Sequence, residues 1–470
     1  MKGIGIMKKI LSILLLIVIS VAFFSGCGNN NEIEFIINES TKTLTISGNG
    51  AATSNLIAED DERISLVETI EFSDEITSLE CSLSSFNNVD KVIFGKNFSS
   101  LGYEVDEYNC YLLPLNIKEI EIDSDNENLI YDEYGILSNS DTILYCTNKQ
   151  LKSYECPSYI KYINEGAFEG VALEKLTLNE GLEEIRSYAF SSEYNSIDTL
   201  IIPKSVKNIG CMAFSGPYGG ESTSVRKLVL KGDINIDSGA FYMAGVEEID
   251  FGTGEVNVGS EAFFCCHLEE LNLTGNIKRI DTIAFSNNPL NIVNVSAESS
   301  NIDTTAFRSS SENLIFIVDE DNINYCSDAE GSLYSKDMSI IYYKKDCNIK
   351  DNQIVFGEGF EVLAPYCVAV EGLDDNTEFI IADGITEIQD YALDYVFVDN
   401  IIVPASVAKL GQISVGEMDY YNYKSVTILN PECNLDNFYC GSIETLKGYK
   451  GSTAEKFAVK NNINFEEIFD

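Results

Sequence analysis

The chain has 470 residues, of which 45% are apolar. It contains 31 Lys and Arg and 75 Asp and Glu, which gives a net charge of −44. So acidic a surface repels phosphate backbones, which argues against nucleic-acid binding. The apolar fraction is that of a folded protein, and the length suits two or three ordinary domains or one long repeat array.

The N-terminus has the pattern of an export signal. Lys8 and Lys9 precede a continuous apolar run over residues 10–24, and small residues follow it. A basic flank, an apolar core and a small-residue end are typical of a secretory signal. The run is also shorter than the roughly 20 residues of a membrane-spanning helix. We therefore predict a signal peptide over residues 1–26.

The end of this segment favours a lipid anchor. Ser25, Gly26 and Cys27 resemble the bacterial lipobox, in which the Cys becomes the lipidated first residue of the mature chain. The resemblance implies attachment to the membrane through Cys27, with residues 27–32 as a short tether. Plain secretion and an uncleaved anchor are the alternatives.

Residues 33–160 are predicted to form irregular repeats. The segments "VDKVIF" over 89–94 and "IKEIEI" over 117–122 are expected to be strands. The segment 128–146 runs from an apolar strand through a Gly-containing turn to an alternating strand. This pattern predicts a β-hairpin inserted into the array.

Regular repeats follow over residues 161–318. A period of about 22 residues is the signature of a solenoid. Nearly all changes in length fall in one turn after the Phe, where a surface loop tolerates insertion and a packed coil does not. The pair Ala-Phe recurs at intervals of 22, 24, 27, 22, 22 and 22 residues, ending at Phe168, Phe190, Phe214, Phe241, Phe263, Phe285 and Phe307.

Each repeat opens with an apolar phrase such as "LEELNL" over 268–273, whose alternating end predicts a strand with one buried face. No stretch between phrases has the length and period of a helix, so the chain should return through turns and short extended or 3₁₀ pieces. Stacked coils of equal length would bring successive strands into a parallel sheet with right-handed crossovers. We expect Phe285 to fill the space between coils and Ala284 to let the backbone pass close.

The C-terminal third continues this organisation less regularly. Residues 319–350 are predicted to hold a second β-hairpin insert, because 324–343 again runs from strand through turn to strand. Residues 351–440 hold further coils, and residues 441–470 form a terminal segment.

Four elements in this order resemble the BspA-type leucine-rich-repeat proteins of bacterial surfaces. They are the entry "TLTISGNGA" (43–51), the phrase "LIIPKSVKNIGCMAF" (200–214), the hairpin inserts and the ending "IETLKGYKGSTAEKFAVKNNINFEEI" (443–468). The resemblance implies a mainly β, curved right-handed leucine-rich-repeat solenoid with a parallel sheet. It also implies adhesion or other binding outside the cell. Within the terminal cap 441–470, it implies a short helix over 452–462 that covers the open end of the array.

The thirteen cysteines lack the spacing of a disulfide framework. Twelve follow Cys27 with no C-x-x-C among them. Cys211 and Cys266 fall inside repeats, where a thiol is a small buried apolar group. We predict mostly free core thiols and leave one or two disulfides open, with Cys433 and Cys440 as the candidate pair.

Catalytic and metal-binding patterns are sparse. The only histidine, His267, follows Cys265 and Cys266. Either His267 and one of these cysteines form a nucleophile pair, or His267 lies in a surface turn beside a core thiol. The loops 123–128 and 319–324 are rich in Asp and Asn and are interpreted as structural turns or weak calcium sites. No zinc-binding or phosphate-binding motif is present in the sequence, and we predict no cofactor.

The outward positions of the repeated strands form the predicted binding face. They differ from coil to coil while the inward positions repeat, and both a ligand face and a solvated sheet remain open as interpretations. Ile201 and Val229 would give this face a small apolar spot. The two rows of the face are Lys175, Thr199, Lys227, Glu248, Glu270 and Ile292, and Thr177, Ile201, Val229, Asp250, Asn272 and Asn294.

These observations predict a non-catalytic protein of the bacterial cell surface, lipid-anchored to the outer face of the cell membrane, that binds an extracellular protein or glycan. The alternative is a parallel β-helix enzyme acting on extracellular polysaccharide. Such an enzyme would need a basic substrate groove, whereas the arginines are few and dispersed. A solute-binding lipoprotein would need alternating strands and helices around a hinge, a pattern that this sequence lacks.

Overall fold

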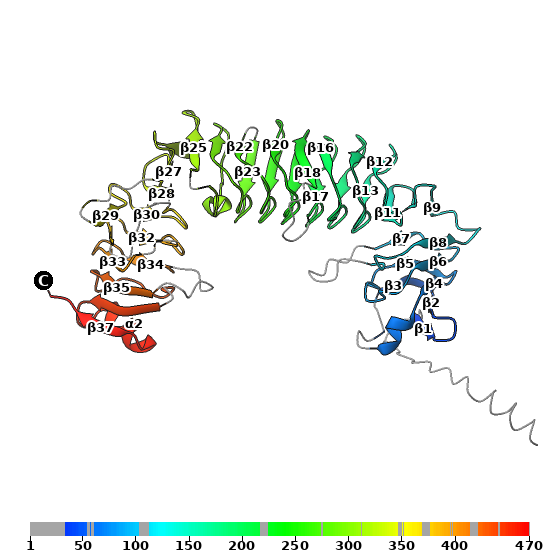
Figure 1. Ribbon diagram of the computed structural model, residues 1–470, viewed down its shortest axis with the longest axis horizontal. Coiled ribbons are helices and arrows are strands. Elements are labelled where there is room, and N and C mark those ends of the chain that lie inside the picture. The colour runs from blue at the N-terminus through cyan, green and yellow to red at the C-terminus, as the bar shows by residue number, and fades with distance from the viewer. Residues whose placement is uncertain are drawn as a thin grey trace, which may run out of the picture. The chain divides into compact units, whose positions relative to one another are not determined.

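The chain divides into two compact units. Unit 1 is Met1–Leu173 with Gly181–Tyr194, and unit 2 is Glu174–Glu180 with Asn195–Asp470. The computed structural model (Figure 1) describes residues 33–53, 57, 61–102, 112–216, 224–273, 276–311, 313–345, 350, 352–368, 377–394, 396, 398–413, 422–439 and 442–469. The predicted signal peptide, Cys27 and the tether lie outside these residues. Within them, no helix has the length and apolar character needed to cross a membrane.

Unit 1 opens with an antiparallel β-hairpin, β1 (Glu34–Asn38) with β2 (Thr43–Ser47), and continues as stacked coils of two strands each. Strands of successive coils pair in parallel, in two ladders whose strands alternate along the chain. The 3₁₀ turn η1 (Glu62–Leu66) follows the first strand of each ladder. The first ladder joins β2, β4 (Thr69–Phe72), β6 (Lys91–Phe94) and β8 (Glu119–Ile122). The second joins β3 (Gly50–Ala52), β5 (Ile76–Leu79) and β7 (Ser100–Leu101).

Aromatic rings fill the core between these early coils. Phe72 and Phe94 stack with ring centroids 5.4 Å apart, and Phe98 lies 4.8 and 4.6 Å from them. All three are buried. The N-terminal stretch is therefore held together in the same way as the later repeats, by rings shared between neighbouring coils.

The first predicted hairpin is confirmed, and a third strand extends it. β9 (Ile130–Tyr131), β10 (Ile136–Ser138) and β11 (Thr142–Cys146) pair antiparallel. β11 then pairs in parallel with β13 (Tyr162–Ile163), which pairs with β15 (Glu184–Ile185). The last strand of the insert thus returns the chain to the parallel array, with β12 (Ser153–Glu155) between β11 and β13 in the sequence.

The regular repeats of unit 2 have two strands per coil, one from the apolar phrase and one from the predicted short extended return. The parallel sheet and the solenoid are thereby confirmed (Figure 1). We call the outward side of the phrase strands the first-strand face. These strands are β14 (Lys175–Thr177), β16 (Ile197–Ile202), β18 (Val225–Leu230), β20 (Glu248–Asp250), β22 (Glu270–Leu273), β24 (Ile292–Val295) and β25 (Ile315–Val318). We call the outward side of the returning strands the second-strand face. These strands are β17 (Asn208–Ile209), β19 (Ile234–Ile236), β21 (Glu255–Val258) and β23 (Asn276–Ile280).

The Ala-Phe pairs join neighbouring coils. The rings of Phe214, Phe241, Phe263 and Phe285 are buried and stack 5.1 to 5.3 Å apart, with successive planes within 4° of parallel. Each Phe N–H also donates to the Ala carbonyl of the next coil, as from Phe263 to Ala284 at 2.8 Å. A larger residue than Ala would force these close-packed backbones apart.

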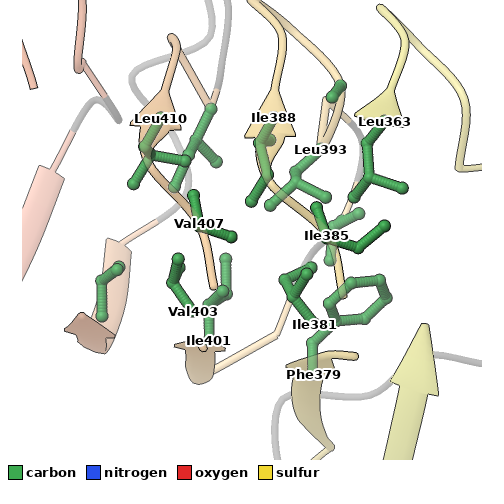
Figure 2. Close-up of a cluster of buried hydrophobic side chains, with 14 of the residues drawn as sticks. Leu363, Phe379, Ile381, Ile385, Ile388, Leu393, Ile401, Val403, Val407 and Leu410 are labelled. Atoms are coloured by element: carbon green, nitrogen blue, oxygen red, sulfur yellow. The ribbon is translucent and has the colours of Figure 1, made fainter. Parts of the chain in front are cut away.

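The second predicted hairpin is confirmed in the same three-stranded form, after the 3₁₀ turn η2 (Thr304–Phe307). β26 (Tyr325–Ser327), β27 (Leu333–Ser335) and β28 (Ile340–Tyr343) pair antiparallel. β28 begins a parallel ladder with β30 (Val362–Leu363), β32 (Glu387–Ile388) and β34 (Lys409–Leu410). The companion ladder is β29 (Gln353–Phe356), β31 (Glu378–Ile381), β33 (Asn400–Val403), β35 (Asn422–Ile428), β36 (Ser442–Gly448) and β37 (Asn464–Glu467). Figure 2 shows buried side chains from both ladders, including Ile388 and Ile401, meeting in one core.

The predicted short helix is confirmed as α2 (Thr453–Asn461). Ser452 is its N-cap, and the Ser452 hydroxyl accepts a hydrogen bond from the N–H of Glu455 at 3.2 Å. Phe457 meets Phe438 edge-on, with ring centroids 5.1 Å apart. The helix therefore packs on the last coils of the C-terminal core.

Candidate ligand-binding surfaces

The structure places the two predicted rows on the first-strand face of unit 2. Strand register decides which residues are neighbours, and each aligned set belongs to one predicted row. The aligned sets are Thr199, Lys227 and Glu248; Ile201, Val229 and Asp250; Glu270 and Ile292; and Asn272 and Asn294. Lys175 and Thr177 lie on β14, at exposed positions on either side of the buried Leu176.

Polar side chains of this face bind one another across the strands. Lys227 forms an ion pair with Glu248. Asn294 donates from Nδ2 to Asn272 Oδ1 at 2.7 Å and to Glu270 Oε1 at 3.2 Å. Cross-strand pairs of this kind contribute only about 0.2–1 kcal/mol each. Their main effect is to hold the polar groups of the face in a fixed arrangement.

The predicted apolar spot is corrected at Val229. Ile201 is 49% exposed, but Val229 is only 7% exposed. Val229 is short and lies between Ile201 and Asp250 on the neighbouring strands. Because side chains directly opposite each other on adjacent strands lie close together, these two neighbours cover it. The exposed apolar residue that sequence reasoning missed is Ile317 of β25, which is 50% exposed and pairs with Asn294.

The second-strand face carries an asparagine ladder that the sequence analysis did not predict. Asn208, Asn235 and Asn257 share one register on β17, β19 and β21. The Nδ2 of Asn257 donates to Asn235 Oδ1 at 2.8 Å, and that of Asn235 donates to Asn208 Oδ1 at 3.1 Å. These asparagines are 27 and 22 residues apart, as are the Ala-Phe pairs beside them. The shared period is the signal that could have found them.

A polar groove of about 440 Å³ lies beside this ladder. Its charged residues are Asp237, Arg279 and Asp281, and Arg279 Nε forms an ion pair with Asp281 at 3.0 Å. One arginine among two aspartates does not make a basic groove. The polysaccharide-cleaving alternative, which needs a basic groove, therefore gains no support from this surface.

A cavity of about 380 Å³ opens in unit 2 where the second insert interrupts the repeats. The Arg308 guanidinium lies 4.5 Å from the Tyr366 ring centroid, and its Nη2 is 3.5 Å from an Asp394 carboxylate oxygen. We call this cavity the aromatic pocket. The residues that define it are Phe307, Arg308, Phe316, Tyr342, Tyr343, Tyr366 and Asp394. None was predicted as a binding residue, because they come from segments far apart in the sequence.

Comparison with protein families identifies the repeats. A family model described as a BspA-type leucine-rich repeat region matches residues 141–228 and 218–330, in six copies. These residues form a BspA-type leucine-rich repeat region. The resemblance predicted from the sequence is thereby confirmed. A search of curated proteins finds no match.

Solved structures of leucine-rich-repeat proteins are similar to this chain at low sequence identity and low TM-score. A leucine-rich repeat protein from Bacteroides ovatus is 12% identical, with 95% of this chain and 100% of that chain covered and a TM-score of 0.36. The pneumococcal vaccine antigen PcpA is 16% identical, with 94% and 98% covered and a TM-score of 0.33. A leucine-rich cell surface protein from Faecalibacterium prausnitzii is 13% identical, with 95% and 99% covered and a TM-score of 0.31.

The described thiols behave as core groups. The nine cysteines that the structure describes form no disulfide with one another, whereas Cys440, the candidate partner of Cys433, lies outside the described residues. Burial raises the pKa of the Cys266 thiol to about 12, so the thiolate that a nucleophile needs is disfavoured. For Cys266 and His267 the structure supports the surface turn beside a core thiol.

In both acidic loops an asparagine side chain is hydrogen-bonded to the preceding coil. In the first, Asn126 Nδ2 donates to the carbonyls of Gly95 and Phe98 of the preceding coil. In the second, Asn322 Nδ2 donates in the same way to the carbonyls of Ser296 and Ser299. Among the described residues, no group of three or more His, Cys, Asp or Glu is arranged to hold a metal ion. The structural-turn interpretation accounts for these loops.

Glu165 is an ionisable group at an unfavourable position in unit 1. Its Oε2 is buried and, among the residues that the structure describes, has no hydrogen-bond partner. Burial raises the Glu165 pKa to about 7, and the Arg186 guanidinium offsets part of this rise. A carboxyl whose pKa is higher in the folded state than in the unfolded state, where it is about 4.3, lowers stability once both states are ionised.

Replacing Glu165 by Gln is therefore expected to stabilise the protein at high pH only. The melting temperature of Glu165→Gln should match that of the wild type near pH 3, where the carboxyl is protonated in both states. As the pH rises to about 7, the melting temperature of the variant should rise relative to that of the wild type, and above pH 7 the difference should stay constant. Thermal unfolding followed by circular dichroism measures this. A difference in melting temperature between Glu165→Gln and the wild type that stays flat with pH would contradict the prediction.

Proposed function

We propose that this chain is a non-catalytic, lipid-anchored protein of the bacterial cell surface that binds an extracellular protein or glycan through its first-strand face. The BspA-type repeats support a role in binding or adhesion. One observation carries the assignment to this face. Inward residues such as Leu228 and Leu271 are buried and alike, while outward residues differ and leave Ile201 and Ile317 exposed among polar groups. Single exposed apolar side chains surrounded by polar groups suit the anchor residues of a partner-binding surface.

A binding screen with matched variants tests this proposal. The full-length protein is presented to host matrix proteins, cell-wall glycans and neighbouring bacteria, and each captured ligand is titrated. Ile201→Glu combined with Ile317→Glu should weaken binding by about tenfold or more, because the apolar anchors are lost. Ile323→Glu is the control, since Ile323 is 80% exposed and lies outside this face. Capture of no ligand, or equal binding by all variants, would refute the proposal.

The lipid anchor makes a separate prediction. Cells supplied with radioactive palmitate should label the wild type and not Cys27→Ala, and the variant should leave the membrane fraction. Two acyl chains suffice for stable anchoring, since each buried methylene contributes about 0.8 kcal/mol. Cys265→Ala should label like the wild type. Persistent labelling of Cys27→Ala would rule out Cys27 as the lipidated residue.

A further inference from the structure

The aromatic pocket lies where the ring stack of the regular repeats ends. Phe285 stacks on Phe307 at 6.0 Å with planes 7° apart, but the next ring, Phe316, meets Phe307 edge-on at 5.3 Å and 79°. The insert separates the coil of Phe307 from the later coil that carries Tyr366. Protein interiors are close-packed, so the space of about 380 Å³ at this interruption is unusual, and its size is within the range of small-ligand sites.

The accessible walls of the pocket are tyrosine rings. Tyr342, Tyr343 and Tyr366 are partly exposed, while Phe307 and Phe316 beside them are buried. Edge-on contact with Phe316 at 5.3 Å holds the Tyr343 ring, and the Tyr343 hydroxyl donates to the Leu314 carbonyl at 3.3 Å. Rings held in place with polar tips suit a ligand that has one apolar face and a polar edge.

The polar groups of the pocket carry no net charge. Arg308 and Asp394 are an ion pair, so together they offer N–H donors and carboxylate acceptors. Thr304 and the serines at 309–311 add hydroxyl groups to the lining. The chain's charge of −44 disfavours an anionic ligand. A wholly apolar ligand would cover Arg308 and Asp394 without offering them hydrogen bonds.

We propose that the aromatic pocket binds a neutral hexopyranose unit of a glycan. The C–H face of the sugar ring packs on a tyrosine ring, sugar hydroxyls donate to the Asp394 carboxylate, and sugar oxygens accept from the Arg308 guanidinium. This inference rests on the proposed binding function and narrows its ligand to a neutral glycan for this pocket.

Calorimetric titration of the full-length chain tests the inference. A zwitterionic detergent keeps the chain in solution, because alkyl glycosides carry sugar head groups that would compete. The titrants are glucose, galactose, mannose, N-acetylglucosamine and their disaccharides, and at least one should bind with a Kd of about 1 mM or tighter. Tyr366→Ala should weaken that binding about tenfold, whereas Tyr366→Phe should keep it. Tyr242→Ala, which removes a half-buried tyrosine of the regular repeats, is the control and should bind like the wild type.

Asp394→Asn keeps the shape of the side chain and should weaken saccharide binding about tenfold. It decides the question if circular dichroism shows that Tyr366→Ala is unfolded. The inference is overturned if no neutral saccharide binds the wild type, if folded Tyr366→Ala or Asp394→Asn binds as well as the wild type, or if a short aromatic peptide binds the pocket more tightly than any saccharide. Adhesion is measured in parallel with the Ile201→Glu and Ile317→Glu variant. If that variant loses adhesion but the wild type binds no saccharide, the proposal for the pocket is overturned. The proposed function is still supported in that case.

Discussion

Phe263→Ala is expected to lower the free energy of unfolding of the regular repeats by about 3–5 kcal/mol. The Phe263 ring is fully buried between Phe241 at 5.1 Å and Phe285 at 5.3 Å. Its removal opens a cavity that three coils share. Because a coil cannot cover its own apolar side, each repeat depends on its neighbours for stability. The loss should therefore extend beyond the substituted coil.

The next residue in the chain is the matched control. Phe264 is partly exposed and stacks on Tyr242 at 5.1 Å, so Phe264→Ala should cost about 1 kcal/mol, less than a fully buried ring. Guanidinium unfolding followed by circular dichroism gives the overall stability of both variants. Hydrogen exchange then shows whether amides in the coils of Phe241 and Phe285 also lose protection. Equal losses for Phe263→Ala and Phe264→Ala would contradict the shared-core account.

The coil itself could be predicted because its signal is repeated. Each turn of the solenoid buries the same positions, so pairs equivalent to Ala284 and Phe285 recur at a regular period. The period remains recognisable even where one coil has a different residue. The second strand of each coil is weaker in sequence. Asn208–Ile209 is only two residues long and buries only Ile209, which is too little to show a period of two. The register of β17, β19 and β21 is set by stacking on the neighbouring coils, which propensity alone does not reveal.

The candidate sites were less predictable than the fold. Alternation along a strand assigned Ile201 and Val229 to the outward side, but exposure also depends on the length of the side chains on adjacent strands. That is why Val229 is covered. The aromatic pocket shows the same limit on a larger scale. Arg308 and Asp394 are 86 residues apart, and only the return of the chain after the second insert brings them together. No local pattern in either segment indicates the pair.

Asn322→Ala should lower the free energy of unfolding by about 3 kcal/mol, although Asn322 lies in a loop with the composition of a calcium site. Asn322 is fully buried. Its Nδ2 donates to the carbonyls of Ser296 and Ser299, at 2.7 and 3.1 Å. Its Oδ1 accepts from the N–H groups of Asn324 and Tyr325, at 2.8 and 2.9 Å. Truncation leaves buried donors and acceptors unpaired, and each such group costs about 1–3 kcal/mol.

Asn324→Ala is the control, because Asn324 is exposed in the same loop and its truncation should cost no more than about 0.5 kcal/mol. Unfolding by guanidinium measures both variants, with and without millimolar calcium. Since the Asn322 amide oxygen is already engaged by two N–H groups, calcium should leave the wild-type melting temperature unchanged. A calcium-dependent rise that Asn322→Ala abolishes would instead make this loop a metal site. The side chain that fixes the start of the second insert would then be a ligand rather than a structural link between coils.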